Sequence, residues 1–581
     1  MPSRAATLAR RYVSSVCSAC HRACLCAGYA LTRRAAASLH SFESASAHLA
    51  PQSPPLELPG GGAPAPLRLF ASAAVPLAAS GGGPLARPTD DAACFVGGAV
   101  WALDWAPRTP GAREDFLALG THAAGAPPQP MGRAASGPAA LQVWRVPMPG
   151  GGGGGARPAK KPRGKAAKEG AAGGNAAPGD AAGDAAAGGA SVSGGTLPSL
   201  ALLLTHNGAT AWDAKWRPAP PAGAIGTSSL GLLAAALGDG DVVVTAVPRP
   251  AGGAAPRAVA LRPAWRGRAG PAAARAGGLP WTLDWHPSAP HSRLLAGATD
   301  GRVLLFDLAG CTDVAGTRDA PPSPPLLQLL PPSGPPLPVR SVCWAPAALG
   351  PACAPLLLAC GDDGVFSVWD ARAPEAPTWR GRGGQTLLLS AAWSAQPRVF
   401  VAAADSGRVL ITSGLLGRAP ASLGDATLRP GGQSLLRGSP TGAALWSLHV
   451  IDDLMAHCGA DGELVAAALR APRSGRVTAK RVVLASLAAD APQVGAPQDA
   501  PPATLRLRGA RKEEPQTAGD AEGTLNDKAL EAMSLPRQQA LHRCRWGPGD
   551  DDGPRPLAAA GAAGVLRVLH VALLQSNDND E

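Results

Sequence analysis

Short apolar runs recur along most of this chain, and tight turn residues separate them. Many of these runs alternate apolar with polar or small residues, a period of two that is typical of β-strands. In one example, an apolar run begins at Arg293, breaks at Asp300-Gly301 and resumes as far as Asp307. Asp-Gly between two apolar runs predicts a β-hairpin, because such turns need positive φ and glycine adopts it freely.

One phrase recurs ahead of these hairpins and defines an internal repeat. It is plainest at residues 101–107, 212–218 and 281–287, where two tryptophans stand four residues apart, and weaker copies end at Trp344, Trp393, Val450 and Trp546. Seven copies, each with its hairpin, predict three strands per copy. The repeat positions are Trp101, Trp105, Trp212, Trp216, Trp281, Trp285, Trp344, Trp369, Trp393, Trp446 and Trp546.

A fourth strand for each copy is expected in the segments between copies, at residues 201–205, 258–261, 326–330 and 477–487. Four strands in each of seven copies predict an all-β fold, a seven-bladed β-propeller of the WD40 type. A blade cannot bury both faces alone, so neighbours must stack and strands from opposite chain ends must close the ring. We assign the closing strand to residues 66–71, which include Leu67, Leu69 and Phe70.

Long insertions make the repeat irregular. Residues 148–197 are almost all Gly, Ala and Pro, too poor in branched apolar side chains to order themselves, and they predict a disordered loop. Residues 494–536 form a charged insertion with a short helix expected near 525–533. The predicted organisation is a disordered basic extension over residues 1–60, the propeller over 61–575 and an acidic tail over 576–581.

The net charge of +11 lies mainly in two segments. Residues 1–50 contribute +5 and residues 157–168 contribute +6, so the rest of the chain is neutral by subtraction. The candidate DNA-contact or nuclear-import residues are Arg157, Lys160, Lys161, Arg163, Lys165 and Lys168. This cluster fits a nuclear-import signal, a degenerate minor-groove hook with Lys165 in place of the second arginine, or a solvated charge run. Arg266-Gly267-Arg268 and Arg380-Gly381-Arg382 repeat the hook core without basic flanks.

The first 42 residues contain no acid and several Arg and Ser, which fits an organellar transit peptide or an unstructured extension; we favour the extension. Cys17, Cys20 and His21 have the spacing of haem attachment, and Cys24 and Cys26 add potential zinc ligands. No second ligand pair has finger spacing, so we expect chance clustering and neither a metal nor a cofactor. The other cysteines are scattered and suit a reducing compartment.

Catalytic signatures are missing from the sequence, which contains no nucleophile elbow, no His-Glu-x-x-His and no phosphate-binding loop. We therefore expect no enzyme activity. His122, His206, His286 and His457 are interpreted as structural hydrogen-bonding groups. Tryptophans four residues apart share one face of a regular strand, so they are expected to pack together between blades or at the rim. No apolar stretch approaches the roughly 18 residues of a membrane span.

Several of these phrases together resemble the WD-repeat subunit of general transcription factor IIIC. They are residues 100–107, 117–122, 141–144, 230–240, 445–448 and 462–468. The resemblance covers roughly residues 95–470 and implies a nuclear, non-catalytic scaffold in the complex that supports RNA polymerase III transcription of transfer-RNA and other small RNA genes. It implies docking of sister subunits, chiefly the largest, B-block-binding one, with promoter DNA bound indirectly or through the basic loop.

Two departures from the family weaken the DNA and import roles: the region before the ring is short, and the basic motif lies in a loop between the first two blades. The competing interpretation is a generic WD40 scaffold such as a ubiquitin-ligase substrate receptor, whose Trp-Asp-x-Arg signature occurs once, at residues 369–372.

Overall fold

The structure is a computed structural model. It describes residues 42–59, 63–77, 86–109, 112–123, 132–148, 197–218, 229–270, 278–309, 322–330, 336–384, 386–396, 398–412, 433–470, 478–490, 504–511, 535–549 and 553–573.

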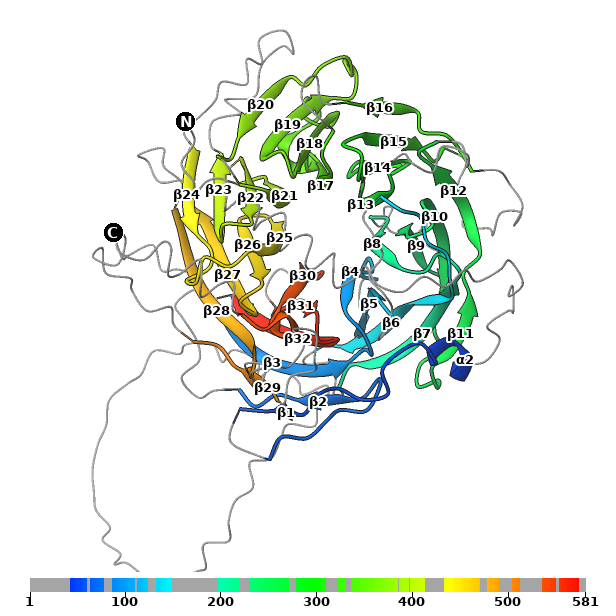
Figure 1. Cartoon of the computed structure of the whole chain (residues 1–581), viewed down its shortest axis with the longest axis vertical. Coiled ribbons are helices and arrows are strands. Elements are labelled where there is room, and N and C mark those ends of the chain that lie inside the picture. The colour runs from blue at the N-terminus through cyan, green and yellow to red at the C-terminus, as the bar shows by residue number, and fades with distance from the viewer. Residues whose placement is uncertain are drawn as a thin grey trace, which may run out of the picture.

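Seven β-sheets stand around a central axis and form a closed ring, which confirms the predicted seven-bladed propeller (Figure 1). Each copy of the repeated phrase forms the innermost strand of one sheet. In order from blade 1 to blade 7 these strands are β4 (Val100–Trp105), β8 (Ala211–Trp216), β13 (Pro280–Trp285), β17 (Val339–Trp344), β21 (Leu388–Ser394), β25 (Leu445–Ile451) and β30 (Leu541–Trp546).

The remaining strands follow outward in each blade. Blade 1 adds β5 (Glu114–Thr121), β6 (Ala139–Pro147), β7 (Ser199–His206) and β11 (Arg257–Ala260); blade 2 adds β9 (Ser229–Leu237), β10 (Asp241–Pro248) and β12 (Pro263–Arg268). Blade 3 adds β14 (Arg293–Ala298), β15 (Val303–Asp307) and β16 (Leu327–Leu329); blade 4 adds β18 (Leu356–Gly361), β19 (Val365–Asp370) and β20 (Trp379–Arg382). Blade 5 adds β22 (Val399–Ala404), β23 (Arg408–Thr412) and β24 (Gln433–Arg437). Blade 6 adds β26 (Leu454–Gly459), β27 (Glu463–Arg470), β28 (Thr478–Ala489), β29 (Leu505–Arg508) and β1 (Leu56–Glu57); blade 7 adds β31 (Arg555–Gly561), β32 (Val565–Leu573), β3 (Ala86–Phe95) and β2 (Ser72–Ala74). Helical turns are α2 (Phe42–Ser46), η2 (Ala347–Leu349) and η4 (Arg537–Gln539).

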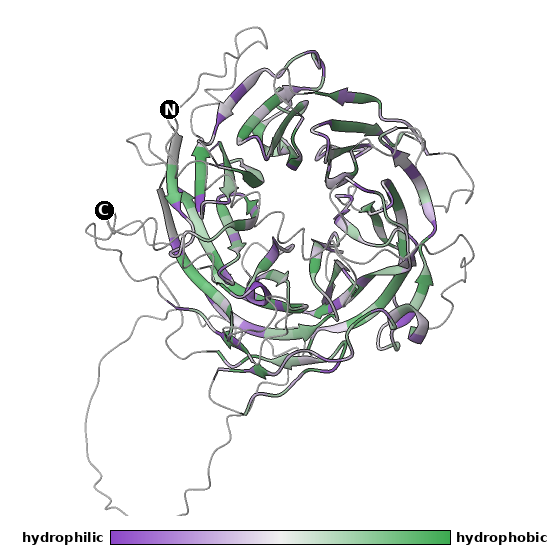
Figure 2. Cartoon of the chain, viewed as in Figure 1, coloured by the Kyte–Doolittle hydropathy of each residue, from purple (hydrophilic) through white to green (hydrophobic). Residues whose placement is uncertain are grey.

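Hairpins join the second and third strands of the blades as the Asp-Gly pairs predict. Gly301, Gly364 and Gly462 follow the turn aspartates with φ of 84°, 66° and 76°, the left-handed region that favours glycine. Hydrophobic residues run along the strands of every blade (Figure 2), and the core consists of the layers between neighbouring sheets. The ring is thus stabilised by stacking of blades rather than by one central core.

The closing strand is β3, not residues 66–71. β3 pairs antiparallel with β32 from Ala86↔Leu573 to Phe95↔Val565, so the two ends of the chain share blade 7. Its apolar alternation is interrupted by Asp90 and Asp91, which obscured it in the sequence. The buried Asp91 carboxylate is matched by Arg567 of β32, whose Nε lies 3.0 Å from Oδ1. Residues 66–71 instead lie outside the blade, where the Phe70 amide donates to the Phe95 carbonyl.

Three further expectations were wrong. Residues 258–261 fall on β11, which pairs parallel with β7 in blade 1, and the outer strand of blade 2 is β12. Part of the predicted charged insertion forms β29, which pairs with β28. Residues 42–59 of the predicted disordered extension pack on the ring, with Ala45, Leu49 and Leu56 buried. Most of the predicted Gly/Ala loop and the helix near 525–533 lie outside the described residues.

Candidate functional site

The centre of the ring is lined by seven innermost strands that share one local geometry. Each has a register shift at the second residue of the repeated phrase, between Val100 and Ala102 in β4 and at the equivalent place in the other six. We number the residues of each strand one to six, so that Trp101 is at position two and Trp105 at position six. A β-bulge changes the direction in which a side chain points, and it interrupts the alternation of side chains between the two faces of the strand. The expectation that Trp101 and Trp105 share a face was therefore wrong.

Position two forms an aromatic collar where the innermost strands begin. The Trp101 ring packs edge-on against Trp212 at 6.4 Å and Trp446 at 6.1 Å, and stacks on His542 at 4.1 Å. Trp281 continues the collar and lies under the Arg340 guanidinium, 4.5 Å from the ring centroid. The bulge turns these side chains toward one another across the axis, whereas Trp105 packs in the core layer between blades 7 and 1.

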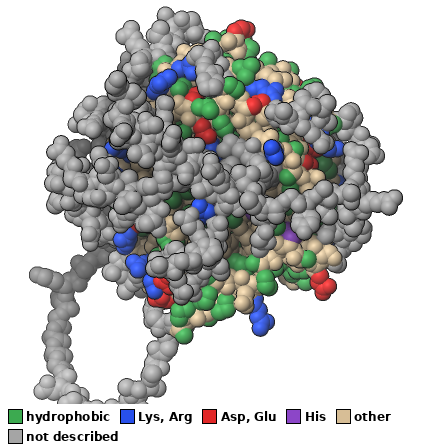
Figure 3. Space-filling model, in the orientation of Figure 1, with side chains coloured by type: hydrophobic (Ala, Val, Ile, Leu, Met, Phe, Trp, Pro, Cys, Tyr) green, Lys and Arg blue, Asp and Glu red, His purple; other side chains and the backbone are tan. Residues whose placement is uncertain are grey.

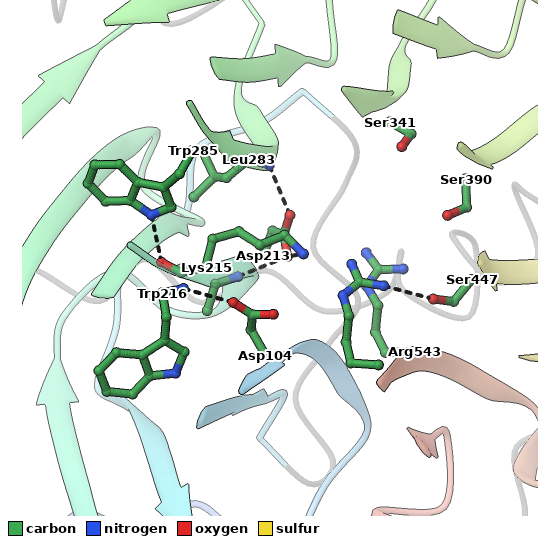
Figure 4. A network of polar contacts seen from close by, with 12 residues as sticks. Asp104, Asp213, Lys215, Trp216, Leu283, Trp285, Ser341, Ser390, Ser447 and Arg543 are labelled. Atoms are coloured by element: carbon green, nitrogen blue, oxygen red, sulfur yellow. Dashed lines mark hydrogen bonds and ion pairs between the residues drawn. The ribbon is translucent and has the colours of Figure 1, made fainter. Parts of the chain in front are cut away.

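In four blades, the side chain at position three accepts a hydrogen bond from the backbone of the next blade. Figure 4 shows these four side chains. The Leu283 amide donates to Asp213 Oδ2 at 2.9 Å, which joins blades 2 and 3. Serines act in the same way across the following seams: the amides of Ala391, Leu448 and Cys544 donate to Ser341, Ser390 and Ser447 at 3.1, 3.1 and 3.2 Å. Small polar side chains at position three therefore satisfy backbone groups that no strand pairing reaches.

Positions five and six use two alternative hydrogen bonds. Where position five is Asp104, Asp284 or His449, its side chain accepts the backbone amide of the next blade's position six, at 2.8, 2.7 and 3.0 Å.

In three other seams the indole of the position-six tryptophan donates instead to the position-five carbonyl of the preceding blade. Trp105 bonds to Arg545, Trp285 to Lys215 and Trp393 to Cys343, at 3.0, 2.9 and 3.4 Å. The indole nitrogens of Trp216, Trp344 and Trp546, in the seams of the first kind, have no hydrogen-bond partner among the described residues. From blade 1 to blade 5 the seams therefore alternate between side-chain acceptors and indole donors, and the same two bonds follow one another at the seams between blades 6 and 7 and between blades 7 and 1.

Charged side chains of the described residues also line the channel. Asp104, Asp213 and Asp284 come from blades 1 to 3, and Lys215, Arg543 and Arg545 are the bases that interact with them. Figure 4 shows Asp104 and Asp213 beside Lys215, with Arg543 across from them. Lys215 Nζ lies 3.8 Å from Asp213 Oδ1, and the three acids balance the three bases. The three serines of position three lie on the opposite wall.

The narrow channel shifts several pKa values. Burial raises the pKa of Asp284 to about 7, with Asp104 and Asp213 adding to the rise, while the Trp344 amide and Lys215 oppose it. Burial lowers the pKa of Lys215, and it lowers that of His449 well below its usual range. Such shifts mark candidate functional groups, but structural networks produce them too. Asp104, Asp213, Asp284 and His449 each accept a backbone amide from a neighbouring blade, so we assign the network to holding the ring.

The sequence-predicted residues fall in three groups. The basic cluster of Arg157, Lys160, Lys161, Arg163, Lys165 and Lys168 lies outside the described residues. The eleven repeat tryptophans all lie in strands: ten on innermost strands and Trp369 buried in β19. Arg372 of the Trp-Asp-x-Arg signature is exposed, and its Nε donates to Asp370 Oδ1 at 2.9 Å.

The two Arg-Gly-Arg sequences have a structural explanation. Both follow a tryptophan. A Cβ at Gly267 would lie 2.2 Å from the ring of Trp265, and a Cβ at Gly381 would lie 2.3 Å from the ring of Phe366 and 2.7 Å from that of Trp379. The glycine therefore makes room for neighbouring aromatic rings. Arg266 and Arg268 both bind Asp241, at 2.5 Å.

The histidines that the sequence analysis interprets as structural differ in whether their rings form hydrogen bonds. His206 Nδ1 accepts the Gly208 amide at 3.2 Å, and His286 contacts the Ser288 and Ala354 carbonyls, as the structural interpretation expects. That interpretation was wrong for His457, whose ring nitrogens have no partner among the described residues. Burial lowers the pKa of His457 to about 3, which keeps the ring neutral.

Within the described part of the chain, no group of three or more His, Cys, Asp or Glu side chains is placed to hold a metal ion. No described helix is long and apolar enough to cross a membrane. The described cysteines are free thiols. Comparison with family models and with curated protein sequences finds no match. The fold and the geometry of the ring are therefore the basis for any functional assignment.

Proposed function

We propose that this chain is a non-catalytic WD40-type scaffold subunit of the transcription factor IIIC complex. Its role would be to hold sister subunits, chiefly the largest one, on promoter DNA during RNA polymerase III transcription in the nucleus. The observation that carries the proposal is the ring itself: seven blades whose innermost strands all descend from one repeated phrase. Propellers of this kind commonly present their faces to partner proteins.

The phrases behind the resemblance also support the proposal by their position. Residues 230–240 form most of β9 and the turn into β10, and residues 462–468 belong to β27 with its preceding turn. Both are buried parts of blades 2 and 6. The polar groups of the channel are engaged in interblade hydrogen bonds, which favours a scaffold over a catalyst.

Affinity purification of the tagged full-length chain from its native nuclei, with mass spectrometry of the recovered proteins, tests the proposal. Recovery of the large transcription factor IIIC subunits is the expected result. Recovery of a cullin-type ligase without those subunits would instead establish the substrate-receptor alternative, for which the exposed Arg372 is the supporting observation. An Arg372→Ala variant is then the discriminating control, because it should lose the ligase and keep transcription factor subunits.

A further inference from the structure

The described residues carry more positive charge than the sequence suggested, where subtraction of the two basic segments left the rest of the chain neutral. Among the described residues, Lys and Arg outnumber Asp and Glu by ten, because many acids lie in segments outside them. On the face seen in Figure 3, basic side chains lie at separate points around the ring. The basic cluster of residues 157–168 is therefore not the sole source of positive charge, and the location of the arginines on the blades becomes informative.

Five arginines lie on the segments of blades 1 and 2 that border the seam between these blades, and we call them the seam patch. They are Arg113, Arg217, Arg249, Arg257 and Arg262. The first three stand at the end of the ring where the innermost strands finish; on the outer wall, Arg257 begins β11 and Arg262 follows the end of β11. Arg113, Arg257 and Arg262 are exposed, and Arg217 and Arg249 are half-buried.

The acids near this seam are mostly matched by other arginines. Glu114 is bound by Arg145 at 2.9 Å, and Asp115 by Arg108 at 3.6 Å. The sequence contains no Asp or Glu between Asp241 and Asp284. Glu43 of α2, which packs beside β11, is an acid in the neighbourhood. The seam patch therefore keeps a net positive charge.

Hydrogen bonds across the seam join the segments of blades 1 and 2 that carry the seam patch. Arg249 Nη2 donates to Thr109 Oγ1 of blade 1 at 3.2 Å, and Arg145 Nη2 donates to the Ala251 carbonyl of blade 2 at 3.0 Å. Between Arg249 and Arg257 the chain passes through Gly252 and Gly253, around whose Cα positions a Cβ would meet nothing within 4 Å. These two glycines of the turn are therefore open to solvent.

We infer that the seam patch binds the phosphate backbone of duplex DNA. Guanidinium groups bind phosphate oxygens in a bidentate manner, and every member of the patch is an arginine. Contacts with the backbone alone carry no sequence preference, so the surface positions DNA without reading it. This inference deepens the proposed function and rests on it for the choice of DNA as the polyanion.

The test is fluorescence anisotropy of a labelled random-sequence duplex of about three helical turns with the purified full-length chain, over a range of KCl concentrations. The variant is R113A/R257A/R262A. Its control of equal charge change is R293A/R398A/R470A, three exposed arginines in blades 3, 5 and 6 at the end of the ring where the innermost strands finish. Thermal unfolding of both variants establishes that the ring is intact.

The seam variant is expected to weaken binding about tenfold or more and to reduce the slope of log affinity against log salt by about 2 to 3, as expected for loss of three phosphate contacts. The control is expected to stay within about twofold of the native chain. Equal losses from both variants would overturn the inference, because net charge alone would then explain binding. Poly-glutamate that competes as well as unlabelled duplex would also overturn it, in favour of an acidic protein partner.

The assay uses the isolated chain and does not depend on the purification from nuclei. Loss of DNA binding confined to the seam variant, together with no recovery of transcription factor IIIC subunits, would overturn the proposed function and leave this inference standing. Recovery of those subunits with no DNA binding by the native chain would do the reverse.

Discussion

Blades 6, 7 and 1 are built more heavily than blades 2 to 5. Their sheets contain six, five and five strands, whereas blades 2 to 5 contain four each. Much of the extra material comes from the segment before the ring: α2 packs on blade 1, β1 pairs with β29 in blade 6, and β2 pairs with β3 in blade 7 (Figure 1). One N-terminal segment therefore braces three adjacent blades.

The difference follows from how the chain connects the blades. In blades 3 to 5 the four strands follow one another directly along the chain, which then runs on into the next blade, whereas in blade 2 the chain crosses to blade 1 as β11 between β10 and β12. In blade 7 the outer strand β3 comes from the N-terminal side and β32 from the C-terminal side, so their pairing is the non-covalent joint of the ring. Where the backbone does not hold a blade together, additional strands and a buried ion pair do.

The buried ion pair of the joint gives the largest expected effect. Asp91 and Arg567 are 7% and 2% exposed, and an Asp91→Ala substitution leaves the guanidinium buried and uncompensated. We expect a loss of about 3 to 5 kcal/mol in the free energy of unfolding by urea. Asp370→Ala, which breaks the pair with Arg372 in blade 4, is the control; the Arg372 side chain is 48% exposed, and about 1 kcal/mol or less is expected. Equal losses would remove the distinction between the joint and the other blades.

The second expected effect concerns the outermost strands. Leu56 of β1 is buried in the core of blade 6, whereas Leu326, just before β16 of blade 3, is 53% exposed. Leu56→Ala should cost about 2 to 4 kcal/mol, because it leaves a cavity in a packed layer. Leu326→Ala should change the unfolding free energy by about 0.5 kcal/mol or less. A neutral Leu56→Ala would mean that the N-terminal segment does not brace the ring.

The third prediction compares how the stability of two seams depends on pH, one among the four-stranded blades and one among the larger blades. The pKa of Asp284, in the seam between blades 3 and 4, is raised to about 7. The folded state therefore holds this proton more tightly than the unfolded chain, and the contribution to stability is lost as pH rises from about 4 through 7. The pKa of His449, in the seam between blades 6 and 7, is lowered, so its contribution is lost as pH falls below about 6.5.

Asparagine retains a hydrogen-bond acceptor at both positions and does not titrate. Compared with the native chain, Asp284→Asn should gain about 2 kcal/mol on going from pH 5 to pH 8, and His449→Asn should gain stability in the opposite direction. Urea unfolding at both pH values measures the two differences. Parallel pH profiles of the native chain and either variant would show that the group does not titrate on folding.

The sequence predicts the innermost strands well because their pattern is local. Two tryptophans around an aspartate mark β4, β8 and β13 without any knowledge of their neighbours, and an Asp-Gly hairpin follows β8 and β13. The bulge at position two could not be predicted, since it depends on how the strand meets the channel. β3 was missed because its Asp91 looks solvent-exposed until Arg567, 476 residues later, is placed beside it. The acceptor role of Asp284 was missed for the same reason, because its donor is Trp344 in another blade.

The smallest expected effect comes from one hydrogen bond, the indole N–H bond that is present in one kind of seam and missing in the other. The Trp105 indole donates to the Arg545 carbonyl across the seam between blades 7 and 1, whereas the Trp216 indole nitrogen, in the seam between blades 1 and 2, has no partner among the described residues. Phenylalanine removes the N–H and a similar volume at both positions, so the cavity cost is shared. Trp105→Phe should therefore destabilise the ring by about 1 kcal/mol more than Trp216→Phe, measured as a difference in unfolding free energy. An equal or reversed ranking would mean that the indole bond contributes nothing and that the joint is held by strand pairing, the ion pair and the N-terminal segment alone.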